Sequence, residues 1–285
     1  MKLFDKISYF ILTKSIGLYI NLMGFLFPQK ATKLAYRFFT EPRDGKLDAT
    51  KIPKILTEAH PETVAFGQHQ IQTYTWKGND HRILLVHGWE SNAARWERFI
   101  GWLKKSGSTI IALDGPAQGL SSGTEFNIPE YARFVDAIMQ KFNPTSIIGH
   151  SMGGATCIYY QYTYQNPLLK KMVILGAPSE FMIVLNNYKK TLSLNKKVSR
   201  LLEKQIMERF GIDPNEFSGS HFASGFNLKG LIAHDEDDAV VSYNEGKQIA
   251  ETWKTAEFIS TKGLGHSLHD DQLYQRIYHF LFEAD

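Results

Sequence analysis

A serine between two glycines is the feature of this sequence best suited to covalent chemistry. The apolar residues Ile147 and Ile148 lead into Gly149-His150-Ser151-Met152-Gly153, and a helix-forming segment follows. Glycines two positions before and after the serine leave room for a very tight strand-to-helix turn. Such a turn would lift the Ser151 hydroxyl above the sheet edge, at a helix N-terminus that favours developing negative charge. The pattern predicts a nucleophilic serine, provided that a base, an acid and oxyanion donors lie nearby.

A second segment could supply backbone donors to the oxyanion that forms when Ser151 attacks a carbonyl. His87-Gly88-Trp89 directly follows residues 82–86, an apolar run typical of a strand that is covered on both faces. The glycine lets the chain turn beneath the nucleophile. The backbone N–H groups of Trp89 and Met152 would then form an oxyanion hole.

An acid and a histidine follow two later predicted strands. His234-Asp235-Glu236-Asp237-Asp238 comes after a strand that ends at Ala233, and Gly263-Leu264-Gly265-His266 comes just before the terminal helix. Because the carboxyl ends of parallel strands meet at one edge of a sheet, both loops should lie beside Ser151. The chain order of serine, acid and histidine is the one expected of a hydrolase built on this turn. His266 would take the serine proton, and an acid would fix its tautomer.

Two other histidines near these segments are assigned structural roles. His150 should point away from the nucleophile, on the opposite side of the turn, and His269 should lie a turn into the last helix. The three-residue spacing of His266 and His269, beside Asp270 and Asp271, is a weak metal pattern without a strong third ligand. We therefore expect neither a metal nor an organic cofactor.

Strands and helices alternate along most of the chain. Strands are expected over residues 70–76, 82–86, 109–113, 146–149, 172–175, 228–233 and 257–260. Helices are expected over residues 93–105, 129–142, 155–164, 244–253 and 270–282. Alternation at these lengths predicts an α/β fold, with a mostly parallel, doubly wound sheet that helices cover on both sides.

One interval breaks this alternation. About fifty residues separate Gly176-Ala177-Pro178 from the next strand, a length typical of a functional insertion. Residues 189–210 place apolar side chains at helical spacing, with Lys and Glu elsewhere. These apolar side chains are Leu192, Leu194, Val198, Leu201, Leu202, Ile206 and Met207. We expect a small helical cap over the carboxyl ends of the strands.

Composition limits the classes of function. A chain of 285 residues with 43% hydrophobic and 21% charged residues is expected to be a globular protein with one large core, or with a core and a small inserted domain. The net charge is +3, but residues 1–54 hold ten Lys or Arg against four Asp or Glu, so the remainder carries −3. A nucleic-acid surface is not indicated on that acidic remainder. The single cysteine, Cys157, fits a reducing, cytoplasmic compartment and is expected to be a buried structural thiol.

The N-terminal segment is unusual because residues 7–27 contain one charge, Lys14. At ~1.5 Å per residue it could cross the hydrocarbon core of a bilayer. Thr13, Gly17, Asn21 and Gly24 form a narrow small-and-polar face. The wide apolar face contains Phe10, Ile11, Leu18, Leu22, Phe25 and Leu26.

Two interpretations of this segment stay open. In the first, residues 1–40 bind a membrane, with Lys2, Lys6, Lys30, Lys33 and Arg37 on anionic headgroups. The enzyme would then work at the inner face of the membrane. In the second, the segment is a helical arm that packs its wide face on the catalytic body.

Taken together, four motifs in chain order resemble the α/β-hydrolase superfamily, and within it the lysophospholipase and esterase-like serine hydrolases with a helical cap. The resemblance covers roughly residues 65–285. The family's histidine-glycine loop matches residues 87–89, and its Asp-x-Pro-x-x-Gly-x-Ser loop matches residues 114–121, with Gln118 where histidine is commoner. Its elbow matches residues 149–153, and its acid loop matches residues 234–242.

The resemblance implies a role for each matched position. It implies a triad of Ser151, Asp238 and His266 and a loop-organising role for Asp114. Within the acid loop, Asp235 stands where the family has glycine and Ser242 where it has proline. These departures leave Asp237 and Asp235 as alternative acids.

These observations predict three segments and one class of reaction. Residues 1–54 form a helical arm and linker, residues 55–177 and 229–285 the hydrolase core, and residues 178–228 the cap. The expected reaction is hydrolysis of a small-molecule or lipid-like carboxylic ester, with Trp89, Met152 and Trp96 as walls of the substrate site. A thioesterase, a carbon–carbon bond hydrolase, an acyltransferase or a non-catalytic binding protein stay as alternatives.

Overall fold

The computed structural model describes residues 3–283, with side chains from residue 7 onward, and it divides into two compact units. Unit 1 combines Met1–Glu41 with Glu180–Ser218. Unit 2 combines Pro42–Ser179 with Gly219–Asp285. The N-terminal arm and the cap insertion, which the sequence presents as separate segments, thus contribute to the same unit.

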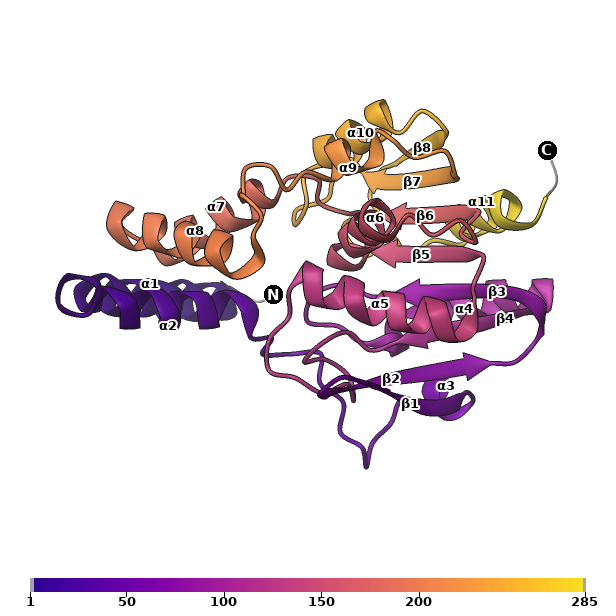
Figure 1. Ribbon diagram of the computed structural model, residues 1–285, viewed down its shortest axis with the longest axis horizontal. Helices are drawn as coiled ribbons and strands as arrows, with labels where there is room; N and C mark the ends of the chain where they lie inside the picture. The colour runs from indigo at the N-terminus through magenta and orange to yellow at the C-terminus, as the bar shows by residue number, and fades with distance from the viewer. Residues whose placement is uncertain (1–2, 284–285) are drawn as a thin grey trace. The chain divides into compact units, whose positions relative to one another are not determined.

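Unit 2 is built on an eight-stranded sheet (Figure 1). Its strand order is β1-β2-β4-β3-β5-β6-β7-β8. The β1–β2 and β2–β4 pairs are antiparallel, and every other neighbouring pair is parallel. The predicted mostly parallel α/β sheet is confirmed. The strands are β1 (His60–Phe66), β2 (His69–Trp76), β3 (Asn79–Val86), β4 (Ser108–Leu113), β5 (Ser146–His150), β6 (Lys171–Leu175), β7 (Lys229–Asp235) and β8 (Ala256–Thr261).

The central strands are continuous apolar runs because both of their faces are covered. Ile83, Leu84, Leu85 and Val86 of β3 are all fully buried. The register places Val86 opposite Gly149 and Leu175 opposite Ala233. The loops that follow β3, β5, β6 and β7 therefore emerge at the same edge of the sheet.

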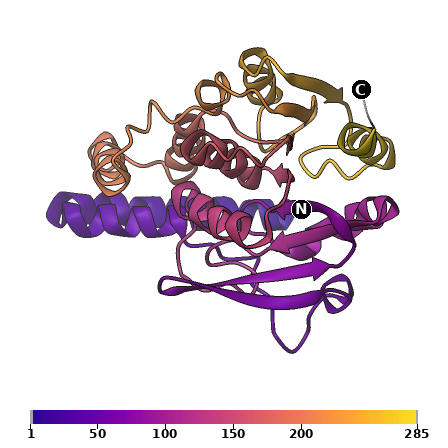
Figure 2. The ribbon, with the colours of Figure 1, turned by 45° about the vertical axis from the view of Figure 1, so that its right-hand side comes forward.

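Helices cover both faces of this sheet. Side chains of α4 (Glu97–Leu103) and α11 (Asp271–Phe282) pack with the strands in one apolar cluster. The opposite layer contains α5 (Ile128–Phe142), α6 (Met152–Tyr164), α9 (Gly219–Ala223) and α10 (Tyr243–Thr252), which contact one another in sequence. Figure 2 separates the layers, with α5 and α6 on one side of the strands and α4 and α11 on the other. Three short helices complete the set: α3 (Lys54–Thr57), η1 (Ala93–Trp96) and η2 (Lys104–Ser106).

Unit 1 is a bundle of four helices. It contains α1 (Leu3–Leu26), α2 (Pro28–Thr40), α7 (Phe181–Leu192) and α8 (Lys196–Phe210). Proline fits the first turn of a helix but cannot continue a preceding one, so the chain turns between α1 and α2. The core of this unit consists of Ile20, Ala31, Ala35, Tyr36, Leu185, Leu192, Val198, Leu202 and Ile206.

The narrow face of α1 is the face that packs inside unit 1. Thr13, Gly17, Ile20 and Gly24 are buried, whereas the large side chains of the wide face are exposed. Gly17 is needed at the contact, because a Cβ there would lie 1.6 Å from the carbonyl oxygen of Leu192. Within unit 1, α1 therefore packs through its narrow face and leaves its wide face exposed.

Candidate active site

The predicted strand-to-helix turn is present between β5 and α6. Ser151 has φ 55° and ψ −126°, a strained conformation for a residue with a side chain. A Cβ on Gly149 would lie 2.6 Å from the carbonyl oxygen of Gly153, and a Cβ on Gly153 would lie 2.3 Å from that of Val86. Only glycine fits at both positions, as the sequence predicts. Ser151 is 7% exposed.

The structure brings Ser151, His266 and Asp238 into one hydrogen-bonded line. The Nε2 atom of His266 lies 2.9 Å from the Oγ atom of Ser151. The Nδ1 atom of the same ring lies 2.8 Å from Oδ2 of Asp238. When Nδ1 donates to the carboxylate, Nε2 is left free to accept the serine proton, which is the arrangement a nucleophilic serine requires.

The Asp238 carboxylate is held by four donors. Its Oδ1 atom accepts from the amides of Val240 and Val241, at 2.8 and 3.0 Å. Its Oδ2 atom lies 3.4 Å from Nε2 of a second buried histidine, His234. Burial alone would raise the pKa of Asp238, but hydrogen bonds from His234, His266 and the two amides outweigh it and lower the pKa. This carboxylate is therefore ionised at neutral pH.

The two alternative acids occupy other positions. Asp235 accepts hydrogen bonds from Oγ1 of Thr261 and from the amides of Leu264 and Gly265, at 2.8, 3.0 and 3.1 Å. It therefore fixes the loop that carries His266, and it does not contact the ring itself. The side chain of Asp237 is exposed. Of the three acids, Asp238 is the one that the structure places against His266.

The loop after β3 passes directly beneath the nucleophile. A Cβ on Gly88 would lie 2.9 Å from Cβ of Ser151, so the backbone approaches the serine as closely as glycine allows. Within the described residues, no hydrogen bond from the Trp89 or Met152 amide to the rest of the chain is present. Both groups can therefore donate to an oxyanion.

Two buried residues, His87 and Asp114, brace this loop. The His87 ring donates from Nδ1 to the carbonyl of Gly88, and its Nε2 accepts from the amide of Gly115, both at 2.8 Å. Burial lowers the pKa of His87 to about 4, so the ring is neutral, as these bonds require. Asp114 accepts from the amides of Ala93 and Leu120, each at 2.9 Å, and its own burial raises its pKa to about 6.

His150, expected on the side of the turn away from the nucleophile, lies beside the catalytic histidine and has a structural role there. Its Nε2 atom donates to the backbone carbonyl of His266 at 2.8 Å, and the two rings lie 4.9 Å apart. Burial lowers the pKa of His150 well below its usual value, so it is a neutral donor. Arg95 donates to the next carbonyl, that of Ser267, at 3.1 Å. His150 and Arg95 therefore fix the two carbonyls that directly follow the catalytic ring along the chain.

The remaining predicted residues have clear surroundings. Trp89 and Met152 are half-buried, and the Trp89 ring lies 5.4 Å from that of Phe126. Trp96 is only 1% exposed and belongs to the apolar core of unit 2. We therefore no longer assign it to the wall of the substrate site. His269 lies before the start of α11 and not a turn into it, and it contacts the hydroxyl of Tyr274 at 2.5 Å.

Neither a metal-binding group nor a reactive thiol is evident in the part of the chain that the structure describes. No cluster of three His, Cys, Asp or Glu side chains there could hold a metal ion. Burial raises the pKa of the Cys157 thiol, which makes it a poor nucleophile.

Comparison with known proteins identifies the fold and its relatives. A protein-family model described as alpha/beta hydrolase fold matches residues 81–193. The human "Serine hydrolase-like protein" is 32% identical over 102 residues, which cover 34% of this chain and 49% of that protein. Phospholipase YtpA of Bacillus subtilis is 26% identical over 114 residues, which cover 37% of this chain and 44% of that protein. Each match spans less than half of the relative's own length.

A solved structure shows the same architecture over most of the chain. An esterase from Rhodococcus sp. superposes with a TM-score of 0.60 at 16% identity, over 80% of this chain and all of that one. At this level of identity the likeness establishes the shared fold.

Proposed function

We propose that this chain, which has the alpha/beta hydrolase fold, is a cofactor-independent serine hydrolase that cleaves carboxylic esters. The observation that carries this proposal is the line from Ser151 through His266 to Asp238, beside two free backbone amides. A nucleophile, its base, the orienting acid and oxyanion donors are the complete set that acyl transfer needs.

Each residue has a defined step in the proposed reaction. Oγ of Ser151 attacks the ester carbonyl while its proton passes to Nε2 of His266. The amides of Trp89 and Met152 stabilise the tetrahedral oxyanion, each contributing on the order of 3 kcal/mol. The C–O bond to the leaving alcohol then breaks, and His266 returns the proton to that oxygen. Water, deprotonated by the same ring, hydrolyses the acyl-enzyme and regenerates Ser151.

An ester with an apolar acyl chain is the substrate class we propose. The half-buried Trp89 and Met152 offer apolar surface beside the nucleophile, and one relative is named a phospholipase. We also place the enzyme in the cytoplasm, at the inner face of a membrane. By length and composition alone, Ile7–Leu26 could cross a bilayer, with a mean hydropathy of 1.3. Hydrolysis of thioesters or C–C bonds and acyl transfer use the same triad and are the alternative reactions.

An ester panel of graded acyl length, run on the wild-type protein and on Ser151→Ala, tests the proposal. We expect hydrolysis to increase from acetyl to medium-chain esters and to fall by several orders of magnitude in Ser151→Ala. A fluorophosphonate should label the wild-type protein at Ser151 alone. Esterase activity that survives in Ser151→Ala would overturn the nucleophile assignment, and a folded wild-type protein that resists labelling would favour a non-catalytic binding protein.

A further inference from the structure

The wide face of α1 is an apolar surface that the packing of unit 1 does not use. Leu18 is 60% exposed and Phe25 is 70% exposed. Nine other large apolar side chains at or next to this helix are more than half exposed: Ile7, Tyr9, Phe10, Ile11, Leu12, Tyr19, Leu22, Leu26 and Phe27. A continuous apolar surface of this kind marks a site of interaction.

The polar atoms of α1 are used on the opposite side. Lys14, the one charged residue among residues 7–27, donates to the carbonyls of Lys190 and Thr191, at 3.0 and 2.8 Å, where α7 ends. Asn21 donates to the carbonyl of Ser193 and accepts from the amide of Asn195, at 2.9 and 2.8 Å. These bonds fix how α1 is rotated against α7 and α8. Among residues 7–26, whose side chains the structure describes, the wide face is therefore left without a charge.

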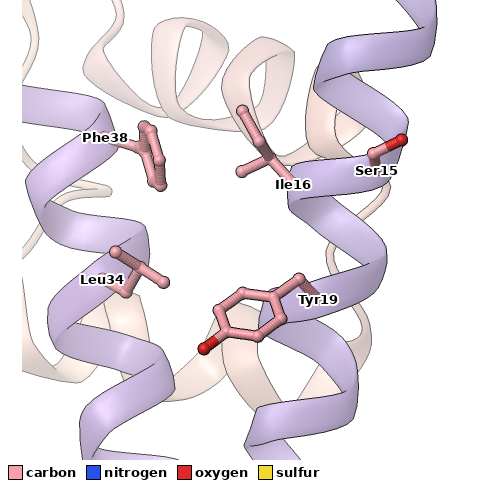
Figure 3. Close-up of a pocket in the computed structure, with 5 residues that line it drawn as sticks. All are labelled: Ser15, Ile16, Tyr19, Leu34 and Phe38. Carbon is pink, nitrogen blue, oxygen red and sulfur yellow. The ribbon is translucent and has the colours of Figure 1, made fainter.

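A groove extends this apolar surface toward α2. It has a volume of about 430 Å³ and lies between the two N-terminal helices, with Ile16 and Tyr19 of α1 facing Leu34 and Phe38 of α2 (Figure 3). Ser15 is the fifth lining residue. An open apolar groove next to an apolar helix face suits a hydrocarbon chain.

The charge of the protein is concentrated in the same unit. Unit 1 contains 13 Lys and Arg against seven Asp and Glu, a net charge of +6, whereas the rest of the chain carries −3. Lys30, Lys33 and Arg37 are exposed on α2, and Nζ of Lys30 lies 5.2 Å from the centre of the exposed Phe27 ring. Cations beside an apolar surface favour the anionic headgroups of a bilayer.

We propose that unit 1 binds an anionic lipid bilayer with α1 lying in the plane of the membrane, its wide face in the acyl-chain boundary and lipid chains in the α1–α2 groove. This proposal rests on the membrane association included in the proposed function, and it specifies how the association is made. It makes the cap helices α7 and α8, through α1, part of the membrane-bound unit.

The packing of α1 excludes a transmembrane position, although its length permits one. The middle of the helix, at Gly17, rests on Leu192 at the end of α7, and the exposed cations Lys190, Lys196 and Lys197 lie within five residues of that contact. If α1 crossed the bilayer, its midpoint would carry these cations into the hydrocarbon core. Charged groups there are strongly unfavourable. An in-plane helix keeps them on the water side.

Depth measurements along α1 distinguish the two orientations. Single cysteines replace Ile11, Leu18 and Phe25 in three full-length variants and carry an environment-sensitive fluorophore, with Cys157 buried and unreactive. Quenching by lipids with nitroxides at defined depths then locates each probe in phosphatidylglycerol–phosphatidylcholine vesicles. We expect all three probes at one depth, roughly 5–10 Å below the headgroups. A Leu18→Cys probe at the bilayer centre, with the other two near the surfaces, would overturn the in-plane orientation.

Vesicle co-sedimentation tests the surface itself. Leu18→Asp and Phe25→Asp should each lower vesicle affinity on the order of tenfold, because an exposed apolar group is lost from the contact. Leu168→Asp is the matched control, since Leu168 is 48% exposed in unit 2 and its replacement should leave vesicle affinity unchanged. High salt should weaken binding to anionic vesicles.

Two other results would overturn the proposal, and neither depends on catalysis. One is a wild-type protein that never co-sediments with vesicles. The other is a wide face buried in a dimer, seen as a twofold mass in ultracentrifugation that Phe25→Asp abolishes. Ser151→Ala should bind vesicles like the wild type, so a failure of the catalytic assignment leaves this test intact.

Discussion

At the scale of single residues, the three aspartates at the end of β7 and in the loop after it (Asp235, Asp237 and Asp238) have different roles. Asp238→Asn should lower kcat roughly 10⁴-fold, because the amide favours the wrong tautomer of His266. Asp237→Asn should stay near wild-type activity, since that side chain is exposed. Steady-state kinetics on one soluble ester compares them directly. A larger loss of kcat in Asp235→Asn than in Asp238→Asn would reassign the triad acid.

The low pKa of Asp238 also has a consequence for stability. An acid whose pKa is lower in the folded than in the unfolded protein stabilises the fold above its unfolded pKa of about 4. That stabilisation is lost as the pH falls below this value toward the folded pKa. Asp238→Asn should therefore reduce the free energy of unfolding at pH 7 and flatten its decrease below pH 4. Urea unfolding followed between pH 3 and 7 measures both effects, and an unchanged slope would contradict the hydrogen-bonded carboxylate.

The site residues that could be predicted from the sequence lie in local motifs, whereas those that were missed are identified by their contacts in the folded chain. Ser151, His266 and Asp238 follow from local motifs at strand ends, and the sheet brings them together. His150 contacts the triad through tertiary approach, which no local spacing encodes. His234 lies four residues before Asp238, so its contact is local. The sequence feature that could have identified His150 is its position inside the pentapeptide 149–153, next to the nucleophile. For Asp235, that feature is an acid in place of the family's glycine.

At the scale of elements, the buried strands were predicted well and two other features were not. β1 is a half-exposed edge strand that contains Pro61, so it lacks the apolar run that identifies its neighbours. The cap divides into α7 and α8 at Ser193, which adopts φ 51° at the C-terminus of α7. Glycine is the usual residue at such a helix end, so the sequence gives no sign of the break. Apolar spacing continues across the break and hides it.

The contact of α1 with α7 predicts that a substitution at Gly17 lowers the stability of unit 1 alone. Gly17→Ala would place a methyl group 1.6 Å from the Leu192 carbonyl, so α1 must move, at a cost of about 1–3 kcal/mol to unit 1. All five tryptophans lie in unit 2, so their fluorescence reports that unit while far-UV circular dichroism reports both. We expect the circular dichroism transition to move to lower temperature and the fluorescence transition to stay.

Gly101→Ala is the matched control for this substitution. It adds a Cβ to a helix position with no atom within 4 Å, so it should stabilise unit 2 by about 0.5–1 kcal/mol. A Gly17→Ala protein as stable as the wild type in both signals would show that α1 does not pack tightly on α7.

At the scale of the whole molecule, the second segment of unit 1, residues 180–218, begins and ends at neighbouring points. Glu180 and Ser218 pair as an isolated antiparallel bridge. Just outside it, the amide of Gly219 donates to the carbonyl of Ser179 at 2.7 Å. Unit 2 holds Ser151, Asp238 and His266 and the complete sheet. Unit 2 therefore contains the proposed catalytic groups, and the cap segment can be removed without stretching its backbone.

Two truncations should behave in opposite ways for this reason. Deleting residues 1–41 alone removes α1 and α2 and exposes the apolar side chains of α7 and α8 that packed against them, each contributing about 1.5–3 kcal/mol when buried. That protein should aggregate. Deleting residues 1–41 and also replacing residues 180–218 with two glycines removes both halves of unit 1. The double-deletion protein should be a soluble monomer that hydrolyses short esters and no longer binds vesicles. Light scattering, ester kinetics and vesicle sedimentation compare the two, and aggregation of the double deletion would show that unit 2 needs unit 1 to fold.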